Sequence, residues 1–215
     1  MRRSGLILAV ALAAGFSYVA AGLTPLPPVA LIAWKGAGVG LLAIYAALNA
    51  RTTDGWLLAA VMAFGALGDV LLETHGFVTG GAAFLAGHLV AVALYLRNRR
   101  PVSLGDLTYA GALALFIVLT AYLAPLNRAT AGPIALYATG LAAMTACAWL
   151  SGFPRPLVAA GAIMFAASDL LIFARAGRPA LDIPPTSVAV WGLYFAGQAL
   201  IVLGVLRAQA RTARA

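Results

Sequence analysis

Long apolar runs alternate with short polar segments along the whole chain. Eight of these runs approach the roughly 20 residues that a helix needs to cross the hydrocarbon core of a bilayer. Because lipid offers no hydrogen-bonding partners, each crossing segment must satisfy its own backbone, which predicts α-helices. The expected spans are 5–23, 29–48, 56–73, 80–97, 106–124, 132–150, 156–174 and 187–206. The connecting segments are short and rich in turn-forming residues. The chain is therefore predicted to be an all-α membrane protein, an eight-transmembrane-helix bundle that forms a single integral membrane domain over residues 1–215.

The composition agrees with this pattern and excludes several classes of protein. The chain is 63% hydrophobic and 9% charged, whereas a soluble domain is about half apolar and a quarter charged. The net charge of +8 comes from arginines at the ends of apolar runs, so no nucleic acid partner is expected. With a single cysteine, Cys147, and two histidines, neither an intramolecular disulfide nor a Cys/His metal framework can form. No metal and no cofactor are predicted, and a mixed His/Asp site is the remaining metal alternative.

The distribution of arginines predicts the orientation of the bundle. If the N-terminus is cytoplasmic, the inner segments hold ten arginines and the outer segments hold three, which favours two cytoplasmic termini. The ten are Arg2, Arg3, Arg51, Arg97, Arg99, Arg100, Arg155, Arg207, Arg211 and Arg214; the three are Arg128, Arg175 and Arg178. We expect a multi-pass protein of the bacterial inner membrane. Run 5–23 also fits a signal peptide, but the closely joined apolar segment after it favours a span.

Two aspartates lie inside apolar runs, where a charge is costly. Asp69 follows Gly68 and Asp169 follows Ser168, and in both places large aliphatic residues come next. A charge at the centre of a bilayer costs about 2.5–3.5 kcal/mol on insertion scales, and such residues usually face the interior of a bundle and mark a site. Two close buried carboxyls share protons as a pair and can supply both an acid and a base. Asp69 and Asp169 are therefore the predicted catalytic residues, and the alternatives are a structural ion pair with Lys35 or a hydrogen bond that bridges two helices.

Further polar residues fall at a similar depth. With the predicted topology and a rise of 1.5 Å per residue, polar groups from five spans lie in the outer half of the membrane. The candidates for substrate contacts are Lys35, Glu73, His88, Ser168, Tyr194 and Gln198. Lys35 is the only lysine, and it is expected to pair with one of the aspartates or to bind an anionic group such as a lipid phosphate. Ser168 lacks the Gly-x-Ser-x-Gly surroundings of a nucleophile. Each of these residues could instead be a structural polar contact between helices.

The chain also carries a sign of internal repetition. The segment Ala86-Gly87-His88 is echoed by Ala196-Gly197-Gln198, and each follows its aspartate by one span. This favours two four-helix halves of equal orientation.

The order of these motifs resembles the lysoplasmalogenase (YhhN-like) family of multi-span membrane proteins. The resemblance rests on Lys35 in the second span, Gly68-Asp69-Val70-Leu71-Leu72, Phe84-x-x-Gly87-His88 with Tyr95, Phe165-x-x-Ser168-Asp169, and Tyr194-x-x-x-Gln198. It implies hydrolysis of the vinyl ether bond of lysoplasmalogens to a fatty aldehyde and a glycerophospho-alcohol. It further implies that one aspartate is the acid and the other the base. His88, Tyr194 and Gln198 would then position the water or the ether oxygen, and Lys35 the phosphate. The implied partners are a lysophospholipid substrate and membrane lipids.

A proton- or ion-coupled small-molecule transporter is the competing class. Intramembrane carboxylates and a two-half repeat also occur in transporters. The shape of the cavity distinguishes the two, because a lipid hydrolase needs a pocket that opens to the bilayer or to one face, whereas a transporter needs a path that reaches both faces.

Overall fold

The computed structural model describes residues 2–212 and is built from α-helices. In chain order these are α1 (Arg2–Ser17), α2 (Pro28–Asn49), α3 (Thr53–Arg97), α4 (Leu104–Leu123), α5 (Arg128–Leu150), α6 (Val158–Gly177) and α7 (Pro184–Thr212). Short 3₁₀ helices follow α1 at Tyr18–Leu23 and precede α7 at Pro179–Leu181. The described part of the chain has no named strand, which confirms the all-α prediction. Arg214, one of the ten predicted inner arginines, lies outside the described residues.

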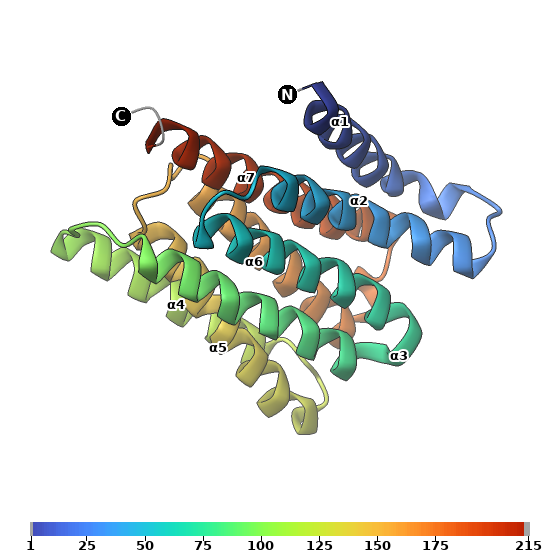
Figure 1. Ribbon diagram of the computed structural model, residues 1–215. Coiled ribbons are helices and arrows are strands. Elements are labelled where there is room, and N and C mark those ends of the chain that lie inside the picture. Colours follow the sequence, from blue (N-terminus) through green and yellow to red (C-terminus); the bar gives the residue numbers. More distant parts are fainter. Residues whose placement is uncertain (1, 213–215) are drawn as a thin grey trace.

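The predicted count of eight helices is not confirmed, because the described residues form seven. Predicted spans 56–73 and 80–97 both fall within α3, whose two helical stretches meet at Gly76, a residue with non-helical backbone angles. Gly76 has φ 81° and ψ −176°, a positive φ that glycine adopts without steric cost. The chain reverses at this residue, so α3 forms two antiparallel arms (Figure 1). Asp54, at the start of α3, accepts hydrogen bonds of 2.9 Å from both Arg97 Nε and Asn98 Nδ2 at its end.

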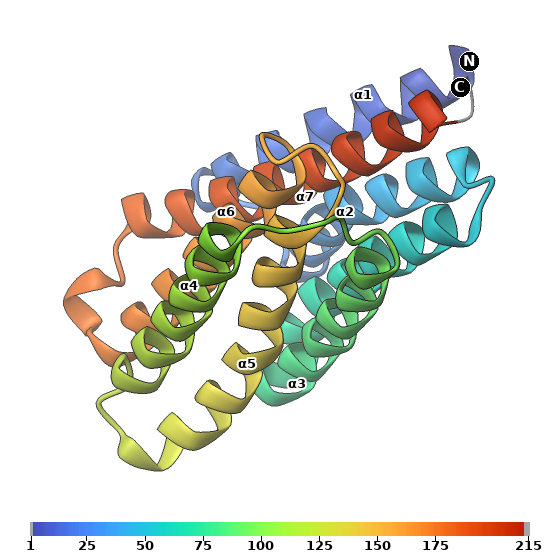
Figure 2. The same ribbon diagram turned by 90° about the vertical axis from the view of Figure 1, so that its left-hand side faces the viewer.

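The helices run side by side and are apolar enough for a membrane. In residues 2–212, seven helices have the length and hydropathy needed to cross a bilayer. Both termini lie at the same end of the bundle in two perpendicular views (Figures 1 and 2). We call this the terminal end; the α2–α3, α3–α4 and α5–α6 connections also lie there. The opposite end holds Gly76 and the α1–α2, α4–α5 and α6–α7 connections.

Helices α6 and α7 touch through two glycines. A Cβ atom on Gly161 would lie 2.6 Å from the backbone oxygen of Gly197, and a Cβ on Gly197 would lie 2.6 Å from the oxygen of Gly161. Small residues of this kind let membrane helices approach until their backbones touch. The close approach continues toward the opposite end, where Ser168 Oγ donates a hydrogen bond of 2.9 Å to the Val190 carbonyl. This packing fixes the rotation of α6, which carries Asp169.

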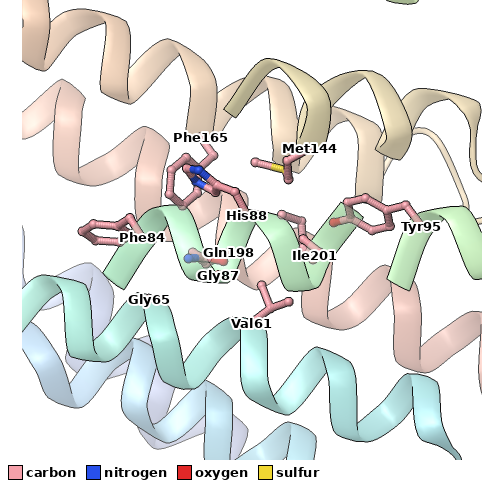
Figure 3. Close-up of a pocket in the computed structure, with 11 residues that line it drawn as sticks. Val61, Gly65, Phe84, Gly87, His88, Tyr95, Met144, Phe165, Gln198 and Ile201 are labelled. Carbon is pink, nitrogen blue, oxygen red and sulfur yellow. The ribbon is translucent and has the colours of Figure 1, made fainter. Parts of the chain in front are cut away.

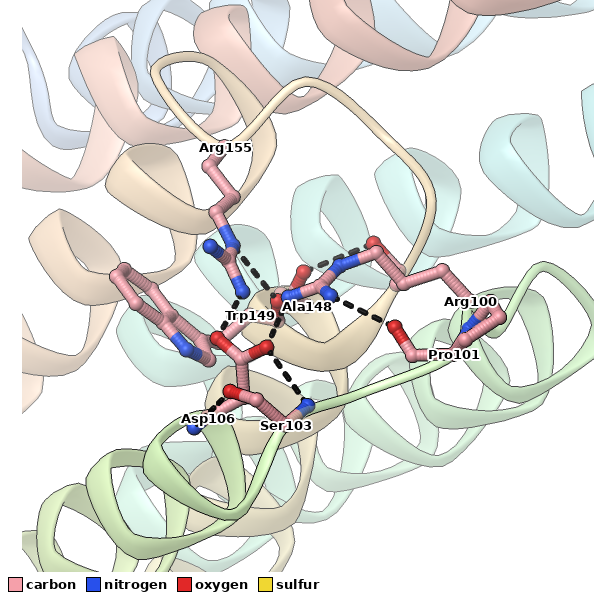
Figure 4. A network of polar contacts seen from close by, with 8 residues as sticks. Arg100, Pro101, Ser103, Asp106, Ala148, Trp149 and Arg155 are labelled. Atoms are coloured by element: carbon pink, nitrogen blue, oxygen red, sulfur yellow. Dashed lines mark hydrogen bonds and ion pairs between the residues drawn. The ribbon is translucent and has the colours of Figure 1, made fainter.

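A polar network joins three segments at the terminal end (Figure 4). Asp106, in the first turn of α4, forms a capping box with Ser103 and an ion pair of 2.9 Å with Arg100. Its second carboxylate oxygen accepts a hydrogen bond from Arg155. The guanidinium of Arg155 also lies 4.4 Å from the centre of the Trp149 ring, within the range of a cation–π contact. The network therefore connects the start of α4 to the α3–α4 and α5–α6 connections.

We expect Asp106→Ala to lower the melting temperature of the purified protein. The substitution removes the carboxylate that pairs with Arg100 and Arg155 and half of the capping box, which leaves two neighbouring positive charges without their partner. Thermal unfolding followed by circular dichroism measures the effect. Asp182→Ala is the matched control, because Asp182 is 70% exposed and makes one ion pair, of 3.5 Å, with Arg175. Equal shifts for the two variants would contradict a structural role for the network.

Candidate active site

A large cavity opens in the half of the bundle that lies away from the termini. Its volume is about 690 Å³, within the usual range for pockets that bind small molecules. The walls come from α3, α5, α6 and α7, with Lys35 contributed by α2, and they are mostly apolar. Ten lining residues are also exposed on the outside of the bundle, and eight of them are apolar. The large ones are Phe77, Val78, Leu126 and Leu136, and the polar ones are Asn127 and Thr130. We call this exposed and mostly apolar edge of the cavity the rim.

Asp69 lies in the wall of this cavity and is held by a tyrosine. The Asp69 side chain is buried on the first arm of α3, and its Oδ2 accepts a hydrogen bond of 2.8 Å from the hydroxyl of Tyr194 on α7. One turn earlier, a Cβ on Gly65 would lie 2.9 Å from Gln198 Nε2 and 3.4 Å from the Tyr194 hydroxyl. The absence of a side chain at Gly65 therefore leaves room for the two polar groups of α7 beside Asp69.

Asp169 is held in the same way by a different tyrosine. Its Oδ2 accepts a hydrogen bond of 2.7 Å from the hydroxyl of Tyr137 on α5, and both residues line the large cavity. Tyr137 was not among the residues selected from the sequence. The available signal was a tyrosine hydroxyl in the middle of the apolar run 132–150, which needs a polar partner when buried.

Lys35 and Glu73 pair with each other. Lys35 Nζ lies 2.6 Å from Glu73 Oε1, and the side chains are 15% and 45% exposed. This corrects the expectation that Lys35 pairs with an aspartate. Glu73 is one helical turn beyond Asp69 and nearer the opposite end, so it reaches Lys35 first. Such a partly exposed pair contributes little to stability by itself, but it places two opposite charges beside the cavity, which Lys35 lines.

Two of the predicted site residues face a different, much smaller cavity. His88 and Gln198 line a space of about 20 Å³ (Figure 3), whereas Ser168 and Tyr194 line the large one. The Phe84 ring belongs to both linings and packs edge-on against Phe165 and Tyr194. The Gln198 amide and the Tyr194 hydroxyl both lie against Gly65. The two cavities are therefore separated by an aromatic wall, with Gln198 and Tyr194 of α7 on its two sides.

The large cavity brings together groups that can exchange protons. A carboxyl group gives or takes a proton, and each of the two carboxyls here is oriented by a phenol. The rest of the wall is mostly apolar, which lowers the local dielectric constant and strengthens electrostatic interactions. In residues 2–212, no three side chains of His, Cys, Asp or Glu are grouped so that they could hold a metal ion.

Seven apolar helices long enough to cross a bilayer, around a cavity that two buried aspartates line, define a multi-pass membrane protein. The model of the YhhN family matches residues 30–205, so the chain belongs to the YhhN family.

Curated relatives of the chain carry a functional name. Proteins called lysoplasmalogenase from Mycobacterium bovis and Mycobacterium tuberculosis are each 32% identical over 158 residues, which cover 69% of this chain and 59% of the relative. The chain thus spans less than two thirds of the length of the curated relatives that it matches. Among solved structures no significant match is found.

Proposed function

We propose that this protein hydrolyses the vinyl ether bond of lysoplasmalogens and releases a fatty aldehyde and a glycerophospho-alcohol. The observation that carries the proposal is the presence of both Asp69 and Asp169 in the wall of one largely apolar cavity of about 690 Å³. The names of the mycobacterial relatives support the same reaction. The substrate is a lysophospholipid, whose single chain matches the apolar walls.

The chemistry of a vinyl ether needs one acid and one base. In the proposed reaction, one aspartate transfers its proton to the β-carbon of the vinyl ether, which leaves an oxocarbenium ion. The other aspartate accepts a proton from the attacking water and stabilises the cation. The resulting hemiacetal then breaks its bond to the glycerol oxygen: the aspartate that gave its proton takes the proton of the hemiacetal hydroxyl, the other aspartate protonates the glycerol oxygen, and the aldehyde leaves. In each aspartate the tyrosine bonds to Oδ2, so Oδ1 is the oxygen proposed to exchange protons. Either aspartate can fill either role.

The Lys35–Glu73 pair is proposed to bind the head group. The pair carries one positive and one negative charge, and the head group carries one of each as well. The Lys35 ammonium would bind the phosphate, and the Glu73 carboxylate would lie near the amine. Ser168 has its hydroxyl proton committed to Val190, so it is proposed to accept a hydrogen bond from the substrate or from water. The alkenyl chain would lie along the apolar walls and reach the bilayer through the rim.

The proposed location is the bacterial inner membrane, crossed eight times with both termini in the cytoplasm. Three observations support this topology: the two antiparallel arms of α3, the position of both termini at one end, and the excess of arginines on that side. The large cavity would then lie in the outer half of the membrane. The proposed repeat of two four-helix halves needs an even number of crossings, which this topology provides.

The alternative function, a proton- or ion-coupled transporter, needs a path to both faces. The large cavity is lined only from the half of the bundle opposite to the termini, and this favours a hydrolase.

The proposal is tested by aldehyde release from 1-alkenyl lysophospholipids by the purified protein in detergent. Lipids with choline and with ethanolamine head groups serve as substrates. The control is a 1-alkyl ether lipid of equal chain length, which lacks the double bond that must be protonated. We expect aldehyde from the alkenyl lipid and none from the alkyl lipid. Lack of turnover with both head groups, or fatty acid release from 1-acyl lipids alone, would refute the proposal and would favour transport or another lipid reaction.

A further inference from the structure

The end of α1 is bound by indole groups from two other helices. Trp191 Nε1 on α7 donates a hydrogen bond of 2.6 Å to the Gly15 carbonyl. Trp34 Nε1 on α2 donates a hydrogen bond of 3.0 Å to the Ala14 carbonyl. Carbonyls in the last turn of a helix lack partners within the helix and accept hydrogen bonds from other groups. These two bonds attach α1 to two helices that carry residues of the candidate site.

Glycines allow α1 to come this close to its neighbours. A Cβ atom on Gly15 would lie 2.0 Å from Cζ of Phe195 on α7, and a Cβ on Gly38 of α2 would lie 2.8 Å from the Gly15 Cα. Small residues at a contact let membrane helices pack until their backbones touch. The helix α1 is therefore packed closely into the bundle, which favours a permanent span over a cleavable signal peptide.

The Trp191 ring is held on several sides. Its side chain is 6% exposed, and its ring stacks on that of Phe195 with 6.1 Å between the centres and 9° between the planes. The centre of the Tyr18 ring lies 4.5 Å away, and that of the Tyr194 ring lies 5.4 Å away. Because the N–H of a buried tryptophan needs a partner, the bond to the Gly15 carbonyl selects the orientation of this ring.

The Trp191 ring packs against the tyrosine that holds Asp69. Tyr194 donates its hydrogen bond of 2.8 Å to Asp69 Oδ2, and the direction of the Tyr194 ring decides where its hydroxyl lies. Besides Trp191, two rings confine Tyr194: Phe84 and Phe165 lie edge-on to it, with centres at 5.8 and 5.2 Å. A change in the position of the Trp191 ring would therefore change the direction of the Tyr194 hydroxyl.

We propose that Trp191 is a positioning residue, held by α1, which directs the Tyr194 hydroxyl to Asp69. The chain of contacts has three direct links. The Gly15 carbonyl binds the Trp191 indole, the Trp191 ring packs against Tyr194, and Tyr194 binds Asp69. The effect on catalysis rests on the proposed function, whereas the coupling between these residues can be measured without substrate.

Melting temperatures of purified variants test this coupling. Tyr194→Phe removes the hydroxyl bound to Asp69 and should lower the melting temperature by about 2–4 °C. In a Trp191→Phe background we expect less than half of that loss, because the hydroxyl is no longer directed to Asp69. Trp34→Phe is the matched control: it loses the equivalent bond to α1, but its ring packs on Tyr18 and not on Tyr194, so the full loss should remain. An equal loss in all three backgrounds would overturn the proposal.

The wild-type protein supplies a test that does not depend on the folding of a variant. The intact mass of the chain purified from membranes should include α1, because without this helix the Trp191 indole loses its partner. A mature chain that begins after Leu23, as removal of a signal peptide would produce, would overturn the proposal.

The effect on catalysis has a separate readout. We expect Trp191→Phe and Tyr194→Phe each to lower kcat for the alkenyl lipid by about five- to tenfold. The double variant should lose no more than the less active single variant, because both changes act on the same hydroxyl. Trp34→Phe should keep kcat within about twofold. Because Trp191 also lines the large cavity, kcat and not KM is the measure.

The outcomes separate this proposal from the proposed function. If the two losses in kcat multiply in the double variant, the positioning role is wrong although the protein is a hydrolase. If the wild type releases no aldehyde, the proposed function fails, and the melting temperatures and the intact mass decide whether α1 and Trp191 position Tyr194.

Discussion

Replacing either intramembrane aspartate with asparagine should remove most of the aldehyde release. We expect Asp69→Asn and Asp169→Asn each to lower kcat/KM for the alkenyl lipid by about 100- to 10,000-fold, the usual contribution of a general acid or base. The amide has nearly the shape of the carboxyl and can still accept the tyrosine hydrogen bond through its oxygen, so the folded structure should persist. The amide cannot exchange the proton that the reaction requires. Initial rates at several lipid concentrations measure the effect.

The double variant and an exposed aspartate complete this experiment. The two carboxyls are proposed to act as a unit. The kcat/KM of the double variant should therefore be about equal to that of the less active single variant, as for other catalytic groups that act together. Asp182→Asn, on an exposed aspartate at the same end of the bundle, should keep the full rate. Turnover that survives either single substitution in well-folded protein would leave the family assignment intact and would exclude the two-aspartate mechanism.

A side chain at Gly161 should prevent α6 and α7 from packing. In Gly161→Val the new Cβ would lie 2.6 Å from the Gly197 carbonyl oxygen, and no side-chain movement can relieve a clash with backbone. The helices must separate, which moves Asp169 away from its cavity wall. We expect destabilisation at the exceptional end for single substitutions, more than about 4 kcal/mol. Size-exclusion chromatography and thermal unfolding in detergent should show loss of the folded, monodisperse species.

A glycine-to-valine substitution on α7, away from the contact with α6, distinguishes loss of helix packing from the lower helix propensity of valine. Gly192→Val also places a β-branched residue in the same pair of helices, but a Cβ at Gly192 meets no atom within 4 Å. This variant should remain folded and monodisperse. Comparable losses in both variants would mean that valine in the helix, and not the contact between α6 and α7, causes the damage.

The sequence predicted depth along the helices better than the direction in which side chains face. Asp69 and Asp169 line one cavity as expected, because a buried charge has few alternatives to the interior of a bundle. His88 and Gln198 were placed in the same layer but belong to the small cavity. In an apolar helix surrounded by lipid and other helices, hydrophobic periodicity hardly distinguishes one face from another, so rotation is decided by packing such as the Gly161–Gly197 contact.

Two further features depended on contacts between distant segments. The partner of Lys35 is chosen by the relative position of α2 and α3, which makes Glu73 nearer than Asp69. The two helical stretches of α3 are joined at a single non-helical residue, Gly76, and a glycine between two apolar runs reads equally well as part of a longer loop. The helix count therefore differed although the apolar runs were located correctly.

The apolar rim of the large cavity has a consequence for how the protein would meet its substrate. Val78 and Leu126 are among the most exposed large side chains of the molecule and belong to the lining, so a lipid from the bilayer surface would reach the cavity along apolar side chains. Under the proposed function, the rate would then follow the mole fraction of substrate in the surrounding membrane or micelle. Added inert detergent would lower the mole fraction of substrate in the micelles and slow turnover, even when the concentration of substrate per volume of solution stays constant.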